Sequence, residues 1–244
     1  MPDQHLDPVV AANYDARVTE RFDPSLLEAT TERLAELAGT GRALEFAIGT
    51  GRVALPLSTR GVEVHGIELS EPMLAELRSK PGGGSIPVAI GDMTTTRVPG
   101  TFSLVYLVFN TIGNLTTQAA QVACFRNAAA HLQPGGHFVI EVAVPDPPRR
   151  DDPIPFRPFS VTDDYIGIDE YADLVDQIMV SHHYRPNDDV GARLSGRFRY
   201  VWPSELDLMA QLAGMTLAHR WADWQRSPFT GSSPDHISVW RRLE

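Results

Sequence analysis

Two glycines separated by one residue, at the end of a short apolar run, constrain the fold of this chain more than any other feature. The run 43–48 precedes Gly49 and Gly51, and a second apolar pattern begins at Val53. This order predicts a strand, a tight turn and the start of a helix. Glycine lets the backbone approach a ligand closely, and a helix N-terminus presents free N–H groups and a positive dipole end. We therefore expect the turn to bind the anionic group of a nucleotide-type ligand.

Residues 49–54 also fit the G-x-G-x-x-G/A fingerprint of dinucleotide-binding proteins, so the turn alone does not identify the ligand. Glu45 favours a different ligand, because a dinucleotide fold normally has an aliphatic residue at this place near the end of the strand. A carboxylate here can accept hydrogen bonds from a ligand amine or ribose, or it can bind structural water. The choice depends on the rest of the chain.

Composition excludes several classes of function. The chain has 244 residues and a formal net charge of −10, which argues against binding a nucleic-acid backbone. Its single cysteine, Cys124, excludes an intrachain disulfide and a cysteine-based zinc site, and its Ala-rich surroundings predict a small buried hydrophobe. We find no signal-peptide pattern and no apolar run of membrane length. We therefore expect a cytoplasmic protein that binds neither nucleic acid nor membrane.

Strand and helix patterns alternate through residue 144. Helices are predicted over 24–38 and 53–60, after the cap 70–72, and over 117–132; strands are predicted over 43–48, 62–68, 86–90, 104–109 and 137–144. The strand 104–109 is mostly apolar, which suits a central position covered on both faces. Such alternation predicts parallel βαβ units, and therefore a doubly wound, Rossmann-like α/β sheet.

Polar or glycine residues stand at or near the predicted strand ends. In a doubly wound sheet, ligands bind outside the carboxyl ends of the strands. We therefore expect the following residues to converge on one site: Gly49, Glu68, Asp92, Asn110 and Glu141.

The pattern changes after residue 144. Residues 145–158 contain six prolines and predict an extended connection. Two alternating stretches, 177–184 and 194–201, flank a turn-rich segment at 186–189 and predict an antiparallel hairpin. Ser204 to Asp207 resembles a capping box in front of a helix that ends at Gly214. Strands at 215–221 and 236–240 close the chain.

Taken in order, these pieces resemble the class I S-adenosylmethionine-dependent methyltransferases over nearly the full length. The resemblance is carried by four blocks in the same order and spacing: 45–51, 66–74, Gly91-Asp92-Met93 and 132–136. It implies a single domain with a seven-stranded sheet whose last strand is antiparallel. We divide this domain into an N-terminal lid and helix (1–38), a cofactor-binding core (39–144), a linker and antiparallel insertion (145–202), and a closing helix and strands (203–244).

The resemblance also implies how S-adenosylmethionine, and its product S-adenosylhomocysteine, are bound. The glycine turn holds the methionine portion, Glu68 holds the ribose hydroxyls, Asp92 accepts from the adenine amine, and Met93 packs on the ring. Two open alternatives are that Glu68 caps the next helix and that Asp92 is a turn aspartate. The complete set of expected cofactor residues is Tyr14, Glu45, Ala47, Gly49, Gly51, Arg52, Glu68, Leu69, Met73, Asp92, Met93, Phe109 and Asn110. A dehydrogenase is disfavoured, because no acid or base for hydride transfer is recognisable downstream.

A finer resemblance points to small-molecule methyltransferases, including natural-product and aminosugar N-methyltransferases. It rests on the predicted hairpin insertion and on the turn 109–115. In aminosugar enzymes the position of Asn114 can carry a catalytic histidine. Asparagine is no base, so that mechanism does not transfer directly.

Methyl transfer from a sulfonium is an in-line displacement, so the protein needs to position the acceptor and exclude water. A base helps only if the acceptor carries a proton. Our catalytic candidates are Tyr14 on the N-terminal segment, Asn114, and the neighbours His182 and His183, of which only one can face the pocket if they lie on a strand. Packing or solvated roles are the alternatives. No histidine spacing predicts a metal site.

The predicted function is methyl transfer to a nitrogen or oxygen of a small-molecule acceptor, such as a natural-product intermediate. The alternative is a module of the same fold that binds the cofactor or a partner without turnover. We expect a monomer or a homodimer.

Overall fold

The structure is a computed structural model that describes residues 6–149, 154–185 and 193–243. Four short or medium helical segments come first: α1 (Pro8–Ala12), α2 (Tyr14–Arg17), η2 (Thr19–Phe22) and α3 (Pro24–Ala38). Asp23 caps α3, because its carboxylate accepts from the backbone N–H groups of Ser25 and Leu26 at 2.9 and 3.1 Å. Pro24 occupies the first helical position, as predicted.

The alternating core forms a seven-stranded sheet. In chain order its first part contains β1 (Ala43–Phe46), α4 (Ala54–Thr59), β2 (Val64–Glu68), α5 (Glu71–Ser79), η3 (Gly83–Ser85), β3 (Val88–Ile90), β4 (Phe102–Leu107), η4 (Thr111–Asn114), α6 (Gln118–His131) and β5 (Leu132–Ala143). The closing part contains α7 (Pro203–Leu212), β10 (Met215–Trp221) and β11 (Asp235–Arg242). The strand order is β10-β11-β5-β4-β1-β2-β3, and β11 runs antiparallel to both of its neighbours. The predicted fold class is confirmed.

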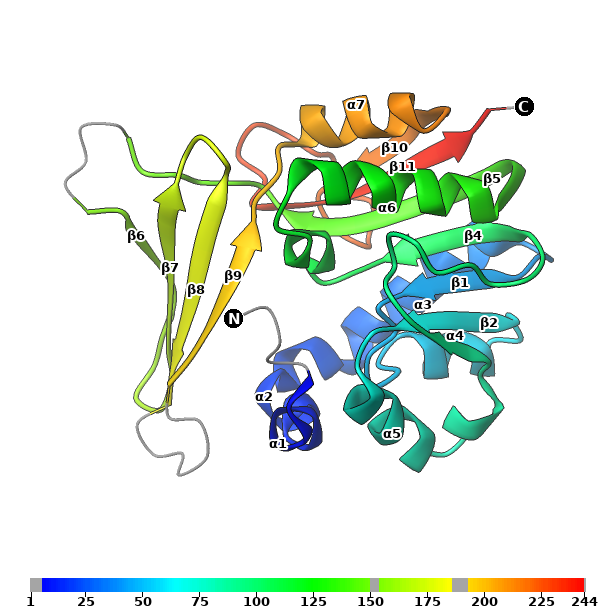
Figure 1. Cartoon of the computed structure of the whole chain (residues 1–244), viewed down its shortest axis with the longest axis horizontal. Helices are drawn as coiled ribbons and strands as arrows, with labels where there is room; N and C mark the ends of the chain where they lie inside the picture. The colour runs from blue at the N-terminus through cyan, green and yellow to red at the C-terminus, as the bar shows by residue number, and fades with distance from the viewer. Residues whose placement is uncertain (1–5, 150–153, 186–192, 244) are drawn as a thin grey trace.

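Each face of this sheet carries its own hydrophobic core. Alternate residues of β4 belong to different cores. Val105 and Leu107 pack toward α6 and α7. Leu104 and Tyr106 pack toward α3, α4 and α5. All six residues of β4 are buried, which confirms its predicted central position. The carboxyl ends of β1, β2 and β4 therefore emerge at one edge, between the two helical layers (Figure 1).

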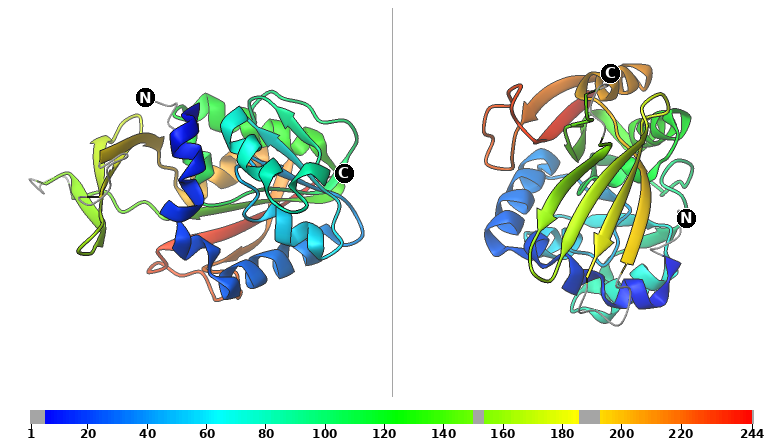
Figure 2. Two further views of the ribbon diagram at one scale, coloured as in Figure 1. Left: turned by 90° about the horizontal axis from the view of Figure 1, so that it is seen from below. Right: turned by 90° about the vertical axis from the view of Figure 1, so that its left-hand side faces the viewer.

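A second, four-stranded antiparallel sheet follows β5. Its order is β6 (Phe156–Val161), β7 (Ile166–Asp173), β8 (Ile178–Tyr184) and β9 (Arg193–Arg199). The predicted hairpin is present as β8 and β9, and two strands that were not predicted precede it. The predicted turn at 186–189 lies outside the described residues. Figures 1 and 2 show this sheet beside the main sheet, with α1 and α2 next to it.

A buried arginine joins the second sheet to the core. Arg199, at the end of β9, is only 4% exposed. Its guanidinium donates to Glu205 of α7 at 2.7 Å and to Gln177 at 2.9 Å. Because an unpaired buried charge is costly, these partners fix the end of β9 against α7.

One local prediction is wrong. The helix α7 begins at Pro203, so Ser204 lies inside its first turn, and the cap residue Trp202 makes no side-chain capping bond. Asp207 instead accepts from Arg220 at 2.7 Å and from the indole N–H of Trp240 at 2.9 Å. Asp207 therefore ties α7 to β10 and β11 rather than closing a capping box.

Candidate functional site

The glycine turn adopts left-handed backbone at three positions. Gly49 has φ +57°, Gly51 has φ +80°, and the non-glycine Ala47 has φ +52°. A Cβ at Gly51 would lie 2.3 Å from Cδ1 of Leu77, so this glycine is required by packing. A Cβ at Gly49 would meet only the carbonyl of Ala47 within 4 Å, at 3.9 Å. The backbone at Gly49 therefore faces open space, as close approach of a ligand requires.

Glu68 supports the turn from the end of β2. One carboxylate oxygen accepts from the N–H of Gly49 at 2.7 Å, and the other accepts from the N–H of Ser70 at 2.8 Å. Burial raises the pKa of Glu68, and the N–H groups of Ser70, Gly49 and Leu69 oppose that rise. A carboxylate has about four lone-pair sites, so these three N–H groups leave acceptor capacity for a ligand hydroxyl. The next helix is capped by Ser70, whose hydroxyl accepts from Met73 at 3.2 Å.

Glu45 lies beneath the turn, on β1. It is 4% exposed, and its carboxylate accepts from the Tyr106 hydroxyl at 2.8 Å. Burial raises its pKa to about 8, a rise opposed by Tyr106, the charge of Arg52 and the N–H of Ala54. The site thus holds a carboxyl that remains largely protonated near neutral pH until a cation approaches it.

The residues expected around the adenine differ in exposure. Leu69 is 59% exposed directly after Glu68, whereas Met73 is buried in α5. Asp92 is exposed, and its Oδ1 accepts from the N–H of Thr94 at 2.7 Å, so it does form a turn. Met93 is buried in the core beside α6. Among these expected residues, Leu69 therefore offers the open apolar surface.

The end of β4 is held by β5. Phe109 and Asn110 are both left-handed, at φ +59° and +60°. Glu141 accepts from the N–H of Phe109 at 3.1 Å, and the amide oxygen of Asn110 accepts from the N–H of Ala143 at 2.7 Å. These bonds hold two strained residues at the carboxyl edge, a typical feature of ligand sites.

Two arginines contact the ring of Phe109. The guanidinium of Arg21, from η2, lies 4.5 Å from the ring centroid, and that of Arg52, from the glycine turn, lies 5.6 Å from it. Arg52 also donates to the carbonyl of Arg21 at 3.1 Å, and Arg21 lies 3.9 Å from Glu141. No local sequence pattern marks Arg21 as a site residue.

The N-terminal segment is tied to the glycine turn by Asp15. Its carboxylate accepts from the Thr50 hydroxyl at 2.6 Å and pairs with Lys80, which also donates to the carbonyl of Thr50 at 2.8 Å. Tyr14 lies next to Asp15 in α2. Burial raises the pKa of Tyr14 to about 12, with smaller effects from Arg52, Asp15 and Glu68. Tyr14 is therefore close enough to Arg52 and Glu68 for their charges to act on it.

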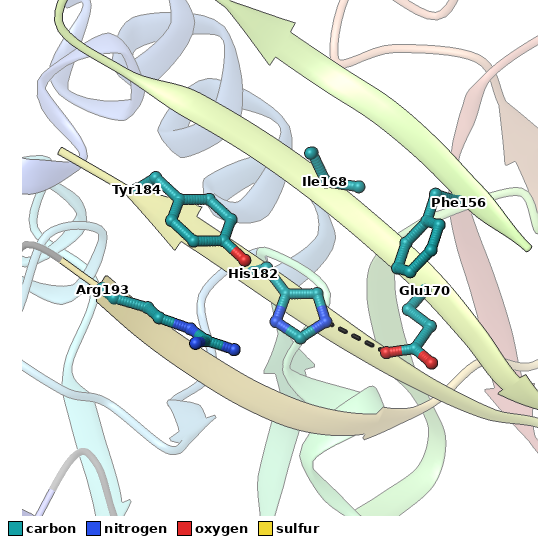
Figure 3. Close-up of a pocket in the computed structure, with 6 residues that line it drawn as sticks. All are labelled: Phe156, Ile168, Glu170, His182, Tyr184 and Arg193. Carbon is teal, nitrogen blue, oxygen red and sulfur yellow. Dashed lines mark hydrogen bonds and ion pairs between the residues drawn. The ribbon is translucent and has the colours of Figure 1, made fainter. Parts of the chain in front are cut away.

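The two candidate histidines lie on opposite faces of the second sheet. His182 pairs with Glu170 at 3.1 Å and with Ser195 at 2.8 Å. It lines a hollow of about 340 Å³ on the outer face, drawn in Figure 3, together with Phe156, Ile168, Glu170, Tyr184 and Arg193. The expectation that only one of the two histidines faces the cofactor side agrees with this geometry.

His183 faces the N-terminal segment. Its Nδ1 lies 2.7 Å from the Tyr165 hydroxyl, and Arg185, two residues on, donates to the carbonyl of Arg17 at 2.9 Å. Burial lowers the pKa of His183, and the charges of Arg185, His182 and Arg17 lower it further. The imidazole is therefore neutral at neutral pH and can accept a proton. Asn114, by contrast, is exposed in η4.

Across the described ranges, no group of three or more His, Cys, Asp or Glu side chains is arranged to hold a metal ion. None of the helices in these ranges is long and apolar enough to cross a membrane.

Comparison with known proteins identifies the family. The model of the family described as "Methyltransferase domain" matches residues 43–136. The solved structure of the CcbJ methyltransferase from Streptomyces caelestis is 35% identical, with 91% of each chain covered and a TM-score of 0.79. With its glycine turn, acidic strand ends and antiparallel last strand, the chain belongs to the class I S-adenosylmethionine-dependent methyltransferases. Its cofactor is S-adenosylmethionine.

Two more relatives are similar over most of their length. The cypemycin N-terminal methyltransferase of a Streptomyces species is 24% identical over 82% of each chain. CalS10 from Micromonospora echinaspora, an amino pentose methyltransferase solved with its S-adenosylmethionine bound, is 23% identical. The alignment with CalS10 covers 94% of this chain and 96% of that one, with a TM-score of 0.70, and shows a common fold.

Proposed function

We propose that this enzyme methylates an amine nitrogen of a small natural-product acceptor. The similarity to CcbJ over 91% of each chain supports methyl transfer, and the amine acceptor is supported by what other relatives are named for. Two further relatives are named for amine acceptors of different kinds, a peptide N-terminus and an amino pentose. An amine is a sufficient nucleophile once it is neutral, so the protein needs to hold it in line and remove a proton.

The cofactor residues are assigned by their chemistry. S-adenosylmethionine supplies an electrophilic methyl group on a sulfonium. We assign its ribose hydroxyls to the free lone pairs of Glu68, and its amino-acid portion to the open backbone at Gly49 above Glu45. The buried Glu45 carboxyl, with its pKa of about 8, fits an incoming α-ammonium, which would favour the ionised form. The exposed side chain of Leu69 fits an adenine face.

The remaining cofactor candidates fall into two groups. Ala47, Gly51 and Asn110 shape the backbone of the site, whereas Arg52 and Phe109 form its wall with Arg21. Met73 and Met93 are buried beneath this surface, and Asp92 keeps one carboxylate oxygen for the adenine amine. The lid residue Tyr14 helps to exclude water, which strengthens polar interactions inside.

Among the catalytic candidates, the geometry favours His183. It is neutral, half-buried and faces the N-terminal segment, whereas His182 is paired with Glu170 on the outer face. Asn114 remains a candidate for hydrogen bonding to the acceptor. As a matched pair, His183→Gln should reduce the transfer rate and His182→Gln should not.

The test compares amines with their matched alcohols. Labelled S-adenosylmethionine is incubated with the protein and with an amino sugar, a peptide N-terminus, and hydroxyl counterparts of each. We expect transfer to at least one amine and none to its hydroxyl counterpart. Transfer to hydroxyls alone would contradict the amine assignment. Tight binding of S-adenosylhomocysteine with no transfer to any acceptor would favour the alternative, a binding module without turnover.

A further inference from the structure

The inner face of the second sheet carries a row of polar side chains that no assigned role explains. On β7 and β8, Ile168, Glu170, His182 and Tyr184 line the outer hollow. Because successive strand residues point to opposite faces, Asp169, Ser181 and His183 lie on the inner face. The register agrees, since Asp169 is paired with Ser181, and Gly167 is paired with His183.

Three of these polar groups are joined by hydrogen bonds, and Asp169 lies beside them. The Tyr165 hydroxyl lies 2.7 Å from Nδ1 of His183, and Nε2 of His183 lies 3.4 Å from the Ser181 hydroxyl. Ser181 lies directly opposite Asp169 in the register of β7 and β8, and its hydroxyl acts to lower the pKa of the Asp169 carboxyl, which burial raises. An ionised carboxylate only accepts, so Ser181 donates to Asp169 and receives the Nε2–H of His183. Nδ1 of His183 is then unprotonated and accepts from Tyr165.

Two glycines, each covered by an aromatic ring, lie beside this row of polar side chains. A Cβ at Gly167 would lie 2.2 Å from the ring of Phe159, and one at Gly196 would lie 2.8 Å from the ring of Phe198. The two rings therefore fold over the glycines on either side of Ser181. Rings in these positions displace water from the polar row, which strengthens its hydrogen bonds.

Two contacts connect the second sheet, on which this row lies, to the rest of the molecule. Toward β4, a Cβ at Gly113 would lie 3.6 Å from Cβ of Phe198. Toward the N-terminal segment, Arg185 donates to the carbonyl of Arg17. Arg17 ends the single-turn helix α2 that begins at Tyr14, and Tyr14 is close enough to Glu68 for its charge to act. The N-terminal segment, which Asp15 joins to the glycine turn, therefore links the second sheet to the cofactor residues.

We propose that Asp169, acting through Ser181, fixes the tautomer of His183 so that the Tyr165–His183 pair takes the proton released by the acceptor. The proposal rests on the amine-methylating function above. The carbon–nitrogen bond forms as the carbon–sulfur bond breaks, which leaves a proton on a cationic nitrogen. That proton moves to the Tyr165 oxygen while the Tyr165 proton moves to Nδ1 of His183. The imidazolium is then stabilised by Asp169 through Ser181.

In this scheme Asp169 and Ser181 are positioning residues. The charged groups around His183 are Arg17 of α2, Arg185 beyond β8, and its neighbour His182. All three oppose an imidazolium. In the proposal, the carboxylate of Asp169, on the same face of the sheet, supplies the compensating negative charge. Removing it should therefore slow proton transfer without weakening acceptor binding.

The first test needs no acceptor. Nitrogen NMR of 15N-histidine-labelled protein reports the tautomer, and His183→Gln assigns the signal. We expect the Nε2–H tautomer at neutral pH, and a shift of this signal in Ser181→Ala. A wild-type Nδ1–H tautomer, or no response to Ser181→Ala, would overturn the proposal. Because no turnover is required, this result is independent of whether the amine panel succeeds.

The second test uses whichever amine the panel identifies. Asp169→Asn should lower kcat by about ten- to a hundredfold with KM for the acceptor nearly unchanged, since base catalysis contributes at least that much. Glu170→Gln, the next acid on the same strand but on the outer face, is the control and should retain wild-type kcat. Equal kcat values in the two variants would contradict the role of Asp169. Ser181→Ala, which keeps the carboxylate, should repeat the loss if Asp169→Asn folds poorly.

Discussion

The carboxylate of Asp15 accepts a hydrogen bond of 2.6 Å from the hydroxyl of Thr50, the residue between the two glycines of the cofactor turn. Asp15 lies in α2 and Thr50 lies 35 positions later, so this bond joins the N-terminal segment directly to the turn. Lys80, just after α5, contacts both residues. The N-terminal segment is thus joined to the turn itself.

Removing this hydrogen bond should weaken binding at the cofactor site. We expect Asp15→Ala to weaken binding of S-adenosylhomocysteine by about 1 kcal/mol, the net contribution of a partly exposed hydrogen bond to a charged group. Calorimetric titration measures the loss. Glu28→Ala, an exposed acid on α3, is the control. An Asp15→Ala affinity equal to that of the control would show that the lid is not held through this contact.

The buried carboxyl of Glu45 should make stability depend on pH in the ligand-free protein. Its folded pKa is about 8, raised from 4.5, so the folded state keeps a proton that the unfolded chain has released. The stability due to this proton is fully present below about pH 4.5 and is lost as the pH rises through about 8. The expected loss is a few kcal/mol, from about 1.4 kcal/mol per pKa unit.

Urea unfolding between about pH 5 and pH 9 tests this. The wild type should lose stability across the range, and Glu45→Gln should lose markedly less. Parallel pH profiles for the two proteins would contradict the raised pKa. The comparison uses the change with pH, so any constant effect of the substitution cancels.

Because α7 lacks the predicted capping box, a comparison of two helix starts gives a stability prediction, with Ser204→Ala as the control. Thr117 is a true N-cap, since its hydroxyl accepts from the N–H of Ala120 at 3.1 Å. Thr117→Ala should therefore reduce the free energy of unfolding by about 1 kcal/mol. Ser204→Ala should change it little, because α7 has no side-chain cap. A larger loss from Ser204→Ala than from Thr117→Ala would mean that the capping box exists after all.

The doubly wound sheet could be predicted because its signals are local: apolar runs, glycine turns and capped helices recur in order. The second sheet was only half predicted. In β6 the pairing with β7 shifts between Pro158 and Ser160, which obscures the alternation expected of a strand. Which face of that sheet each of His182 and His183 occupies depends on how its strands pair. The sequence alone therefore predicted only that the two histidines lie on opposite faces.

Contacts between residues far apart in the chain could not be predicted from the sequence either. Three residues at the site come from segments that carry no sequence motif: Asp15, Lys80 and Arg21. The Asp169–Ser181–His183 row depends on the register of β7 against β8, which includes an irregularity between Tyr171 and Asp173. Pairing between distant strands is decided by tertiary packing rather than by local pattern.

The assignment of the cofactor ribose to Glu68 is tested by calorimetric titration of S-adenosylhomocysteine into Glu68→Ala and Glu71→Ala. Glu71 is an exposed acid three residues along, in the first turn of α5. We predict that Glu68→Ala weakens binding by about 1.5–3 kcal/mol, roughly ten- to a hundredfold in Kd, while Glu71→Ala binds as the wild type does. An unchanged affinity in a folded Glu68→Ala protein would contradict the assignment of the ribose to Glu68.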